Sequence, residues 1–344
     1  MTRSQGCHLT LRVLATVATL LMLPDSQGWA AAETPASSAP TSPPTQMPEV
    51  TVRAHRLELE KRVSKFVNQI AATENGAEGL ARWGSPPACP LVSGLPREDG
   101  EFILERLSEI GRSVGVPLGD EHCRPNLYIL VTSQPEDLLK GMEKRNRKYT
   151  FGVDASSYPP TETRASIVDE FIKTPRPVRV WHNVTENDAW GKPLAYCQSQ
   201  MVMPPPPLCT ETSSIHPAAC DPTRYYRCGS AIAGGSHLVS NSIFTLSRVF
   251  VIVDQARLKG ITAGQLADYV AMSGFAKLKP DAHLGDAPTI LTLFNAAPES
   301  APTGMTDWDQ TFLKSLYATE QKSTLQRSQI AHQMAHQMAH EIGP

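Results

Sequence analysis

Residues 243–253 read Ile-Phe-Thr-Leu-Ser-Arg-Val-Phe-Val-Ile-Val, a long run rich in valine, isoleucine and phenylalanine. This composition predicts one or two buried strands that end before Asp254. A further buried strand is predicted at 126–132, which reads Asn-Leu-Tyr-Ile-Leu-Val-Thr. Residues 178–181, Val-Arg-Val-Trp, alternate as a strand does, and Val-Thr-Val at 50–52 can begin a short one. The chain is therefore expected to contain a sheet.

Helical patterns lie before and between these strands. Apolar residues recur close to the helical period over 57–70 and again over 102–114. Residues 137–144 are predicted as a third helix. Because helices and strands do not alternate strictly, the pattern indicates an α+β fold rather than a regular succession of strand and helix.

Two capping boxes predict helix starts in the last third of the chain. Thr262 with Gln265 begins one helix, which can stop at Gly274, and Thr306 with Asp309 begins another. The predicted fold is thus a single disulfide-bonded α+β domain with a long irregular insertion and a helical C-terminus.

The N-terminal residues have the order of a secretory signal. Arg3 and Arg12 precede an apolar run at 13–23, which is followed by Pro24 and by three alanines at 30–32. This order predicts a signal peptide over residues 1–32, and hence a periplasmic or secreted protein. The run is about half of the roughly 20 residues that span a bilayer, so no transmembrane segment is expected in the mature chain.

Composition divides the rest of the chain. Residues 33–48 are rich in proline, serine and threonine and are predicted to be a disordered linker. An α+β domain is expected over 49–318, and it contains a cysteine- and proline-rich loop at 185–236. Such a loop either faces a partner or is a tolerated surface insertion. Residues 319–344 are predicted to form a C-terminal amphipathic helix.

Six cysteines remain once Cys7 leaves with the signal peptide, and an even number favours three disulfides in an oxidising compartment. The candidates are Cys89, Cys123, Cys197, Cys209, Cys220 and Cys228. Their spacing leaves about fifteen connectivities open. Grouping along the chain suggests Cys89 with Cys123 and two bridges within 197–228. A structural zinc site is the alternative, although the chain lacks the close cysteine pairs that such sites usually have.

Three histidines near the C-terminus, His332, His336 and His340, are spaced four residues apart. His332 and His336 are weak candidates for metal ligands. One ion cannot bind all three, because the first and last are about 12 Å apart along a helix. The favoured interpretation is a duplicated four-residue unit that extends an amphipathic helix. Its apolar row is formed by Ile330, Met334, Met338 and Ile342. No cofactor is predicted.

The charge and the motifs exclude several function classes. Lys and Arg number 32 against 34 Asp and Glu, so no nucleic acid or anionic membrane is predicted as a partner. The chain has no H-E-x-x-H, G-x-S-x-G, P-loop or dinucleotide-binding motif. Asp120, Glu121 and His122 beside Cys123 can ligate a metal, but a polar loop before the strand explains them equally well. The catalytic residues, if there are any, stay unknown.

Much of the span from Val63 to Ile342 resembles a family of uncharacterised exported proteins of Gram-negative bacteria. The resemblance implies no established activity. It is carried by Arg82-Trp83, Cys89-Pro90-Leu91-Val92, Cys123-Arg124-Pro125-Asn126, Pro177 to Trp181, Gln265 to Met272, and Asp309 to Tyr317.

Within this span, residues 265–274 and 286–291 also resemble, remotely, the helix, turn and following segment of zincin-like domains of unknown function. Gln265 and Tyr269 stand where such domains would need two metal-binding histidines. The resemblance therefore implies a related fold without zinc chemistry.

The sequence favours a binding protein of the cell envelope, with an envelope protein or a cell-wall component as its partner. The alternative is a hydrolase with a non-standard active site. A deep pocket that gathers several ionisable residues would favour the hydrolase, whereas a flat or loop-covered surface would favour binding.

Overall fold

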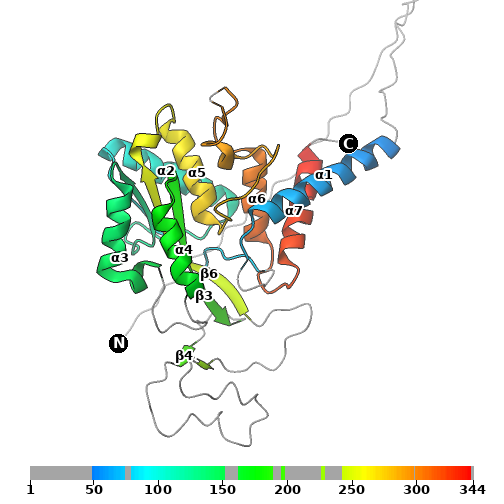
Figure 1. Ribbon diagram of the computed structural model, residues 1–344. Helices are drawn as coiled ribbons and strands as arrows, with labels where there is room; N and C mark the ends of the chain where they lie inside the picture. The colour runs from blue at the N-terminus through cyan, green and yellow to red at the C-terminus, as the bar shows by residue number, and fades with distance from the viewer. Residues whose placement is uncertain are drawn as a thin grey trace, which may run out of the picture. The chain divides into compact units, whose positions relative to one another are not determined.

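The computed structural model describes residues 49–73, 79–151, 162–188, 195–197, 226–228, 242–297 and 299–341 (Figure 1). All of them belong to one compact unit, Met47–Pro344. The predicted signal peptide, the linker and most of the 185–236 loop lie outside the described residues. The helices are α1 (Glu49–Ile70), α2 (Arg97–Val114), α3 (Pro135–Phe151), α4 (Glu162–Lys173), α5 (Ala263–Phe275), α6 (Asp307–Ala318) and α7 (Gln326–Glu341), with short 3-10 turns η3 (Gln255–Arg257) and η4 (Ile290–Thr292).

The main sheet has four strands in the order β1-β2-β6-β3. These are β1 (Pro90–Ser93), β2 (Leu127–Thr132), β3 (Val178–Asp188) and β6 (Ser242–Asp254), and a separate pair is formed by β4 (Ala195–Cys197) and β5 (Tyr226–Cys228). β1, β2 and β6 are parallel, whereas β3 runs antiparallel to β6 and lies at the edge of the sheet. The predicted α+β class is therefore correct.

Both faces of the central strand β6 are buried, which explains its uninterrupted apolar sequence. Val249, Val251 and Val253 point into the larger core, which includes residues of α2, α5 and α6. Phe250 and Ile252 point to the opposite face, where they pack with residues of α3 and α4. Helices thus cover the sheet on both sides.

Helices α1, α6 and α7 pack together beyond the sheet (Figure 1). Phe66 of α1 makes edge-to-face contacts with Trp308 and Phe312 of α6, with ring centroids 5.3 and 6.2 Å apart. The apolar row of α7 is buried at Ile330 and Met334, as the repeat predicts. Helix α7 therefore belongs to the main core, and Ile342, the last residue of the predicted row, lies outside the described residues.

The two capping boxes predicted for α5 and α6 are both present. Gly274 lies one residue before the end of α5 rather than beyond it. A Cβ atom at this position would lie 3.2 Å from Cδ1 of Leu127, so glycine allows α5 to approach β2 closely. Its carbonyl oxygen also accepts a hydrogen bond of 2.8 Å from Nε1 of Trp83.

Several sequence-based boundaries differ from the structure, and the helix predicted at 137–144, for example, spans Pro135–Phe151. Residues 50–52 are helical, because the helix predicted at 57–70 extends back to Glu49, and the short strand is wrong. β3 continues to Asp188, because residues 184–188 pair with β6, so the irregular insertion begins later than 185. Residues 319–325 are not helical, since Thr319 caps α6 through its hydroxyl on the Ser315 carbonyl at 2.6 Å.

No helix within the described parts of the chain is both long and apolar enough to cross a bilayer.

Candidate functional site

A cavity of about 110 Å³ lies beside the edge strand β3, between this strand, α5 and the connection that follows α5. Its polar or ionisable lining residues are Arg176, His182, Tyr269, Ser273, Lys279 and Asn295. Its apolar lining residues are Val178, Val180, Leu278, Pro280, Ala282, Leu284 and Leu291. The cavity therefore combines an apolar wall with a small number of polar groups, as ligand sites do.

Strand alternation places His182 in this cavity. Val178, Val180 and His182 share the face of β3 that points to α5, whereas Trp181 packs in the α3 and α4 layer. The Nε2 atom of His182 lies 2.8 Å from the carbonyl oxygen of Ser273. Because a carbonyl oxygen only accepts, the neutral ring carries its proton on Nε2.

The His182 imidazole is neutral near pH 7. Burial lowers its pKa to about 4, against the opposing effect of backbone contacts with Ser273 and Ala276. The cavity thus contains a polar ring without a positive charge.

Helix α5 contributes two hydroxyl groups. The Tyr269 ring packs edge to face on Phe294, with centroids 5.0 Å apart. Burial raises the pKa of the Tyr269 phenol to about 12, opposed by the nearby charge of Arg176, so the phenol stays protonated. The hydroxyl of Ser273 donates to the Tyr269 carbonyl at 2.8 Å within the helix.

Two cations, Arg176 and Lys279, are among the residues that line the cavity. Nη2 of Arg176 donates to both carboxylate oxygens of Asp281, at 2.7 and 2.9 Å. The ammonium of Lys279 donates to the carbonyl oxygen of Asn68 at 2.9 Å. None of the residues that line the cavity carries a carboxylate. The lining residues therefore carry two positive charges, of which that of Arg176 is paired with Asp281 outside the lining.

This arrangement suits binding better than hydrolysis. The Ser273 hydroxyl bonds to a helix carbonyl, the Tyr269 phenol is protonated, and His182 is a weak base whose Nε2 already donates. No nucleophile and base therefore form a pair among the lining residues. The volume is also below the roughly 300 Å³ of a typical small-molecule site, and it is close to the roughly 150 Å³ of a cavity that holds benzene. One side chain or a very small molecule fits.

No protein-family model, curated protein or solved structure matches this chain.

The buried His182 leads to a prediction about pH. We expect the free energy of unfolding to fall as the pH drops from about 6.5 to about 4, because only the unfolded chain takes up a proton on this ring in that window. The loss is at most about 1.4 kcal/mol per pH unit. His182→Gln retains a donor for the Ser273 carbonyl and removes the titration. Urea unfolding of both proteins across this window should give a flatter profile for the variant. Parallel profiles would contradict the assignment.

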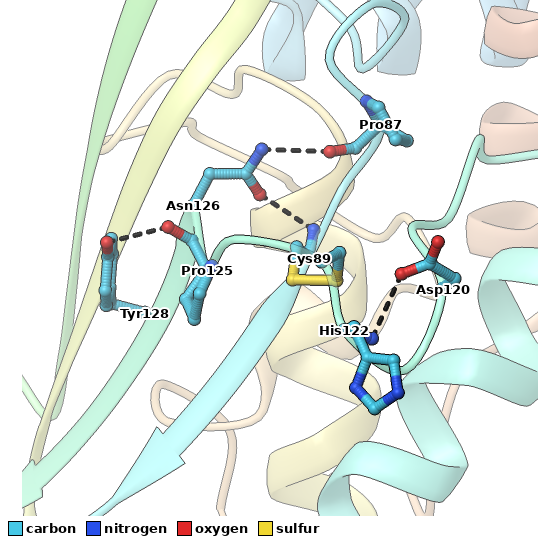
Figure 2. The surroundings of a disulfide bond; sticks show 8 residues. Pro87, Cys89, Asp120, His122, Pro125, Asn126 and Tyr128 are labelled. Carbon is cyan, nitrogen blue, oxygen red and sulfur yellow. Dashed lines mark hydrogen bonds between the residues drawn. A yellow bond between two sulfur atoms is a disulfide. The ribbon is translucent and has the colours of Figure 1, made fainter.

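Among the predicted site residues, Cys89 and Cys123 form a disulfide (Figure 2). It joins the residue before β1 to the loop before β2. The Asn126 side chain also joins the loop before β2 to the segment before β1. Its Oδ1 accepts from the Cys89 backbone N–H at 2.7 Å, and its Nδ2 donates to the Pro87 carbonyl at 2.9 Å. The suggested pairing of these two cysteines is therefore present.

The other cysteine predictions cannot be placed. Cys209 and Cys220 lie outside the described residues. Cys197 and Cys228 lie on β4 and β5, where only the backbone is described. Their partners stay a prediction.

The polar segment before Cys123 forms a turn. The backbone N–H of His122 donates to Oδ1 of Asp120 at 3.0 Å (Figure 2). The Cys123 N–H donates to the Asp120 carbonyl at 3.1 Å. Asp120 therefore bonds to the His122 backbone rather than to its ring. A polar loop accounts for this segment.

The histidines of the repeat lie on the exposed face of α7. The rings of His336 and His340 contact each other with centroids 4.5 Å apart, and no ring contact joins His332 to His336. Within the parts of the chain that the structure describes, no three His, Cys, Asp or Glu residues group as a metal site would require.

Gln265 and Tyr269 have separate roles. They stand where zincin-like domains would need two metal-binding histidines. Oε1 of Gln265 accepts from the Thr262 backbone at 3.0 Å and Nε2 donates to the Pro302 carbonyl at 2.8 Å, so Gln265 caps α5. Only Tyr269 reaches the cavity.

Sequence reasoning missed His182, Arg176, Lys279 and Asn295. The sequence offered one signal for His182. If the alternation of the strand predicted at 178–181 is continued by one residue, His182 falls on the same face as Val178 and Val180.

Proposed function

We propose that this chain is an exported binding protein of the cell envelope, and that its cavity receives one group of an envelope protein or a cell-wall component. The observation that carries the proposal is the cavity itself. It has the size of one side chain, and its polar lining lacks a paired nucleophile and base. Specificity pockets of this kind hold an anchoring group of a partner at many interfaces.

The disulfide supports the proposed compartment. Bridges such as Cys89–Cys123 persist in oxidising environments and are rare in the cytosol. The secretory pattern of residues 1–32 favours the same location.

The hydrolase alternative gains some support from the ionisable residues that line the cavity. It needs an activated nucleophile, however, and Ser273 and Tyr269 are both in unreactive states. Binding requires only complementary shape and hydrogen bonds, which the lining provides.

Filling the cavity tests the proposal. Ala282→Trp places a large ring in a space of about 110 Å³ and is expected to reduce capture of the partner at least tenfold. Capture is measured by quantitative mass spectrometry after affinity purification from the native envelope. Leu325→Trp is the matched control, because Leu325 is exposed and does not line the cavity.

Thermal unfolding of both variants checks that the fold is intact. Equal capture by the wild type and by a folded Ala282→Trp variant would disprove the role of the cavity. Turnover of an ester or peptide substrate that the Ala282→Trp variant loses would favour the hydrolase instead.

A further inference from the structure

We infer that the group received by the cavity is a carboxylate on a short apolar stem. This inference rests on the proposed binding function and specifies the chemistry of its ligand. It follows from the charge, the donors and the size of the cavity, taken in turn below.

The charge of the lining favours an anion. Arg176 and Lys279 line the cavity, and no lining residue is acidic. Asp281 contacts the Arg176 guanidinium at a single nitrogen, Nη2, and its own side chain is 66% exposed. Lys279 donates to the carbonyl oxygen of Asn68 in the last turn of α1, where the helix dipole offsets only part of its charge. An entering carboxylate would meet a net positive field.

The neutral polar groups complement the same ligand. The phenol of Tyr269 is protonated at neutral pH, as a tyrosine normally is, and can therefore donate; burial raises its pKa further, to about 12. Asn295 carries an amide with two donor hydrogens. A carboxylate accepts several hydrogen bonds, and charge-assisted bonds of this kind are stronger than bonds between neutral groups.

The apolar wall and the volume of the cavity indicate how long and how apolar the stem of the ligand is. Val178, Val180 and Leu291 line the cavity beside the polar groups, so aliphatic carbon can contact them. A space of about 110 Å³ accepts a few carbon atoms and one carboxylate. Butyrate has this form, and so do an acidic side chain and the last residue of a peptide.

The experiment titrates ¹⁵N-labelled full chain with butyrate, butyramide and butylamine, followed by NMR. Butyrate is expected to give saturable shifts at His182, Tyr269 and Ser273, in the millimolar range. Butyramide and butylamine should bind at least tenfold more weakly, because neither carries a negative charge. N-acetylalanine and the α-amide of N-acetylglutamate then distinguish a terminal carboxylate from a side-chain carboxylate, since the tighter of the two identifies the source.

Variants of Lys279 test whether butyrate binds in the cavity. Lys279→Gln is expected to weaken butyrate binding at least tenfold, whereas Lys279→Arg retains it. Lys259→Gln is the matched control, because Lys259 is exposed and does not line the cavity. Thermal unfolding confirms that each variant folds.

Equal binding of butyrate and butyramide, or an unchanged affinity in a folded Lys279→Gln variant, would overturn the inference. So would the absence of saturable shifts at the cavity. The binding function itself still stands if Ala282→Trp abolishes partner capture while butyrate does not bind. Conversely, butyrate binding with unimpaired capture by Ala282→Trp would refute the proposed function.

Discussion

Replacing Asp309 with alanine is expected to lower the free energy of unfolding by about 3–5 kcal/mol. The Asp309 side chain is fully buried. It accepts hydrogen bonds from the Thr289 hydroxyl at 2.5 Å, the Ile290 backbone at 2.8 Å, and the Thr306 backbone and hydroxyl at 3.0 and 2.9 Å. Alanine would leave the buried Thr289 hydroxyl and Ile290 N–H without this acceptor, and each such loss costs about 1–3 kcal/mol.

Two further variants distinguish the contribution of the hydrogen bonds of Asp309 to stability from the contribution of its charge. Burial raises the pKa of the Asp309 carboxyl, against the effect of its hydrogen bonds, so a neutral replacement is tolerated better than a truncation. Asp309→Asn retains an acceptor and is expected to cost less than Asp309→Ala. Asp307→Ala, at an exposed position in the first turn of α6, should cost less than about 1 kcal/mol.

Urea unfolding with linear extrapolation measures all three. The account fails if Asp309→Ala is no more destabilising than Asp307→Ala.

Removing the disulfide by changing Cys89 and Cys123 to alanine is expected to lower the free energy of unfolding by about 3–4 kcal/mol. The two cysteines are 34 residues apart in sequence, and a loop of this length gives a stabilisation of that order in the chain-entropy treatment. The effect acts mainly on the unfolded chain, so the native contacts around Asn126 should persist.

A reductant alone does not isolate this bridge, because it would also reduce any bridge formed among the four further cysteines at 197–228. The double variant and the wild type are therefore compared in urea, first without and then with dithiothreitol. In the reductant the difference should shrink to about 1 kcal/mol, because neither chain then holds the crosslink. A difference that is the same in both conditions would show that the bridge does not stabilise the protein.

The buried strands could be predicted from the sequence, because a strand that is covered on both faces has apolar residues at successive positions. The run at 243–253 and the segment at 126–132 are apolar without strict alternation, since α3 covers one face of the sheet and α2 and α5 the other. β1 was missed because it has four residues and alternates between partly buried and exposed positions. α4 was missed although Ile167, Val168, Phe171 and Ile172 follow the helical period.

The candidate site was harder to predict, because its residues come from separate parts of the chain. Arg176 precedes β3 and His182 lies on β3. Tyr269 lies on α5, and Lys279 and Asn295 lie in the connection beyond α5. Each residue alone is equally compatible with a surface position. Only the packing of α5 over the edge strand brings them together, and no local pattern encodes that packing.

The pairing of α1 with α7 determines when folding can finish. Phe66 and its apolar neighbours on α1 emerge from the ribosome early, but Met334 and Met338, on the partner helix, are made last among these elements. At a synthesis rate of about 5–20 residues per second, α7 is made roughly 15–50 s after α1. The nascent chain therefore cannot complete the α1–α7 part of its core until α7 has been made.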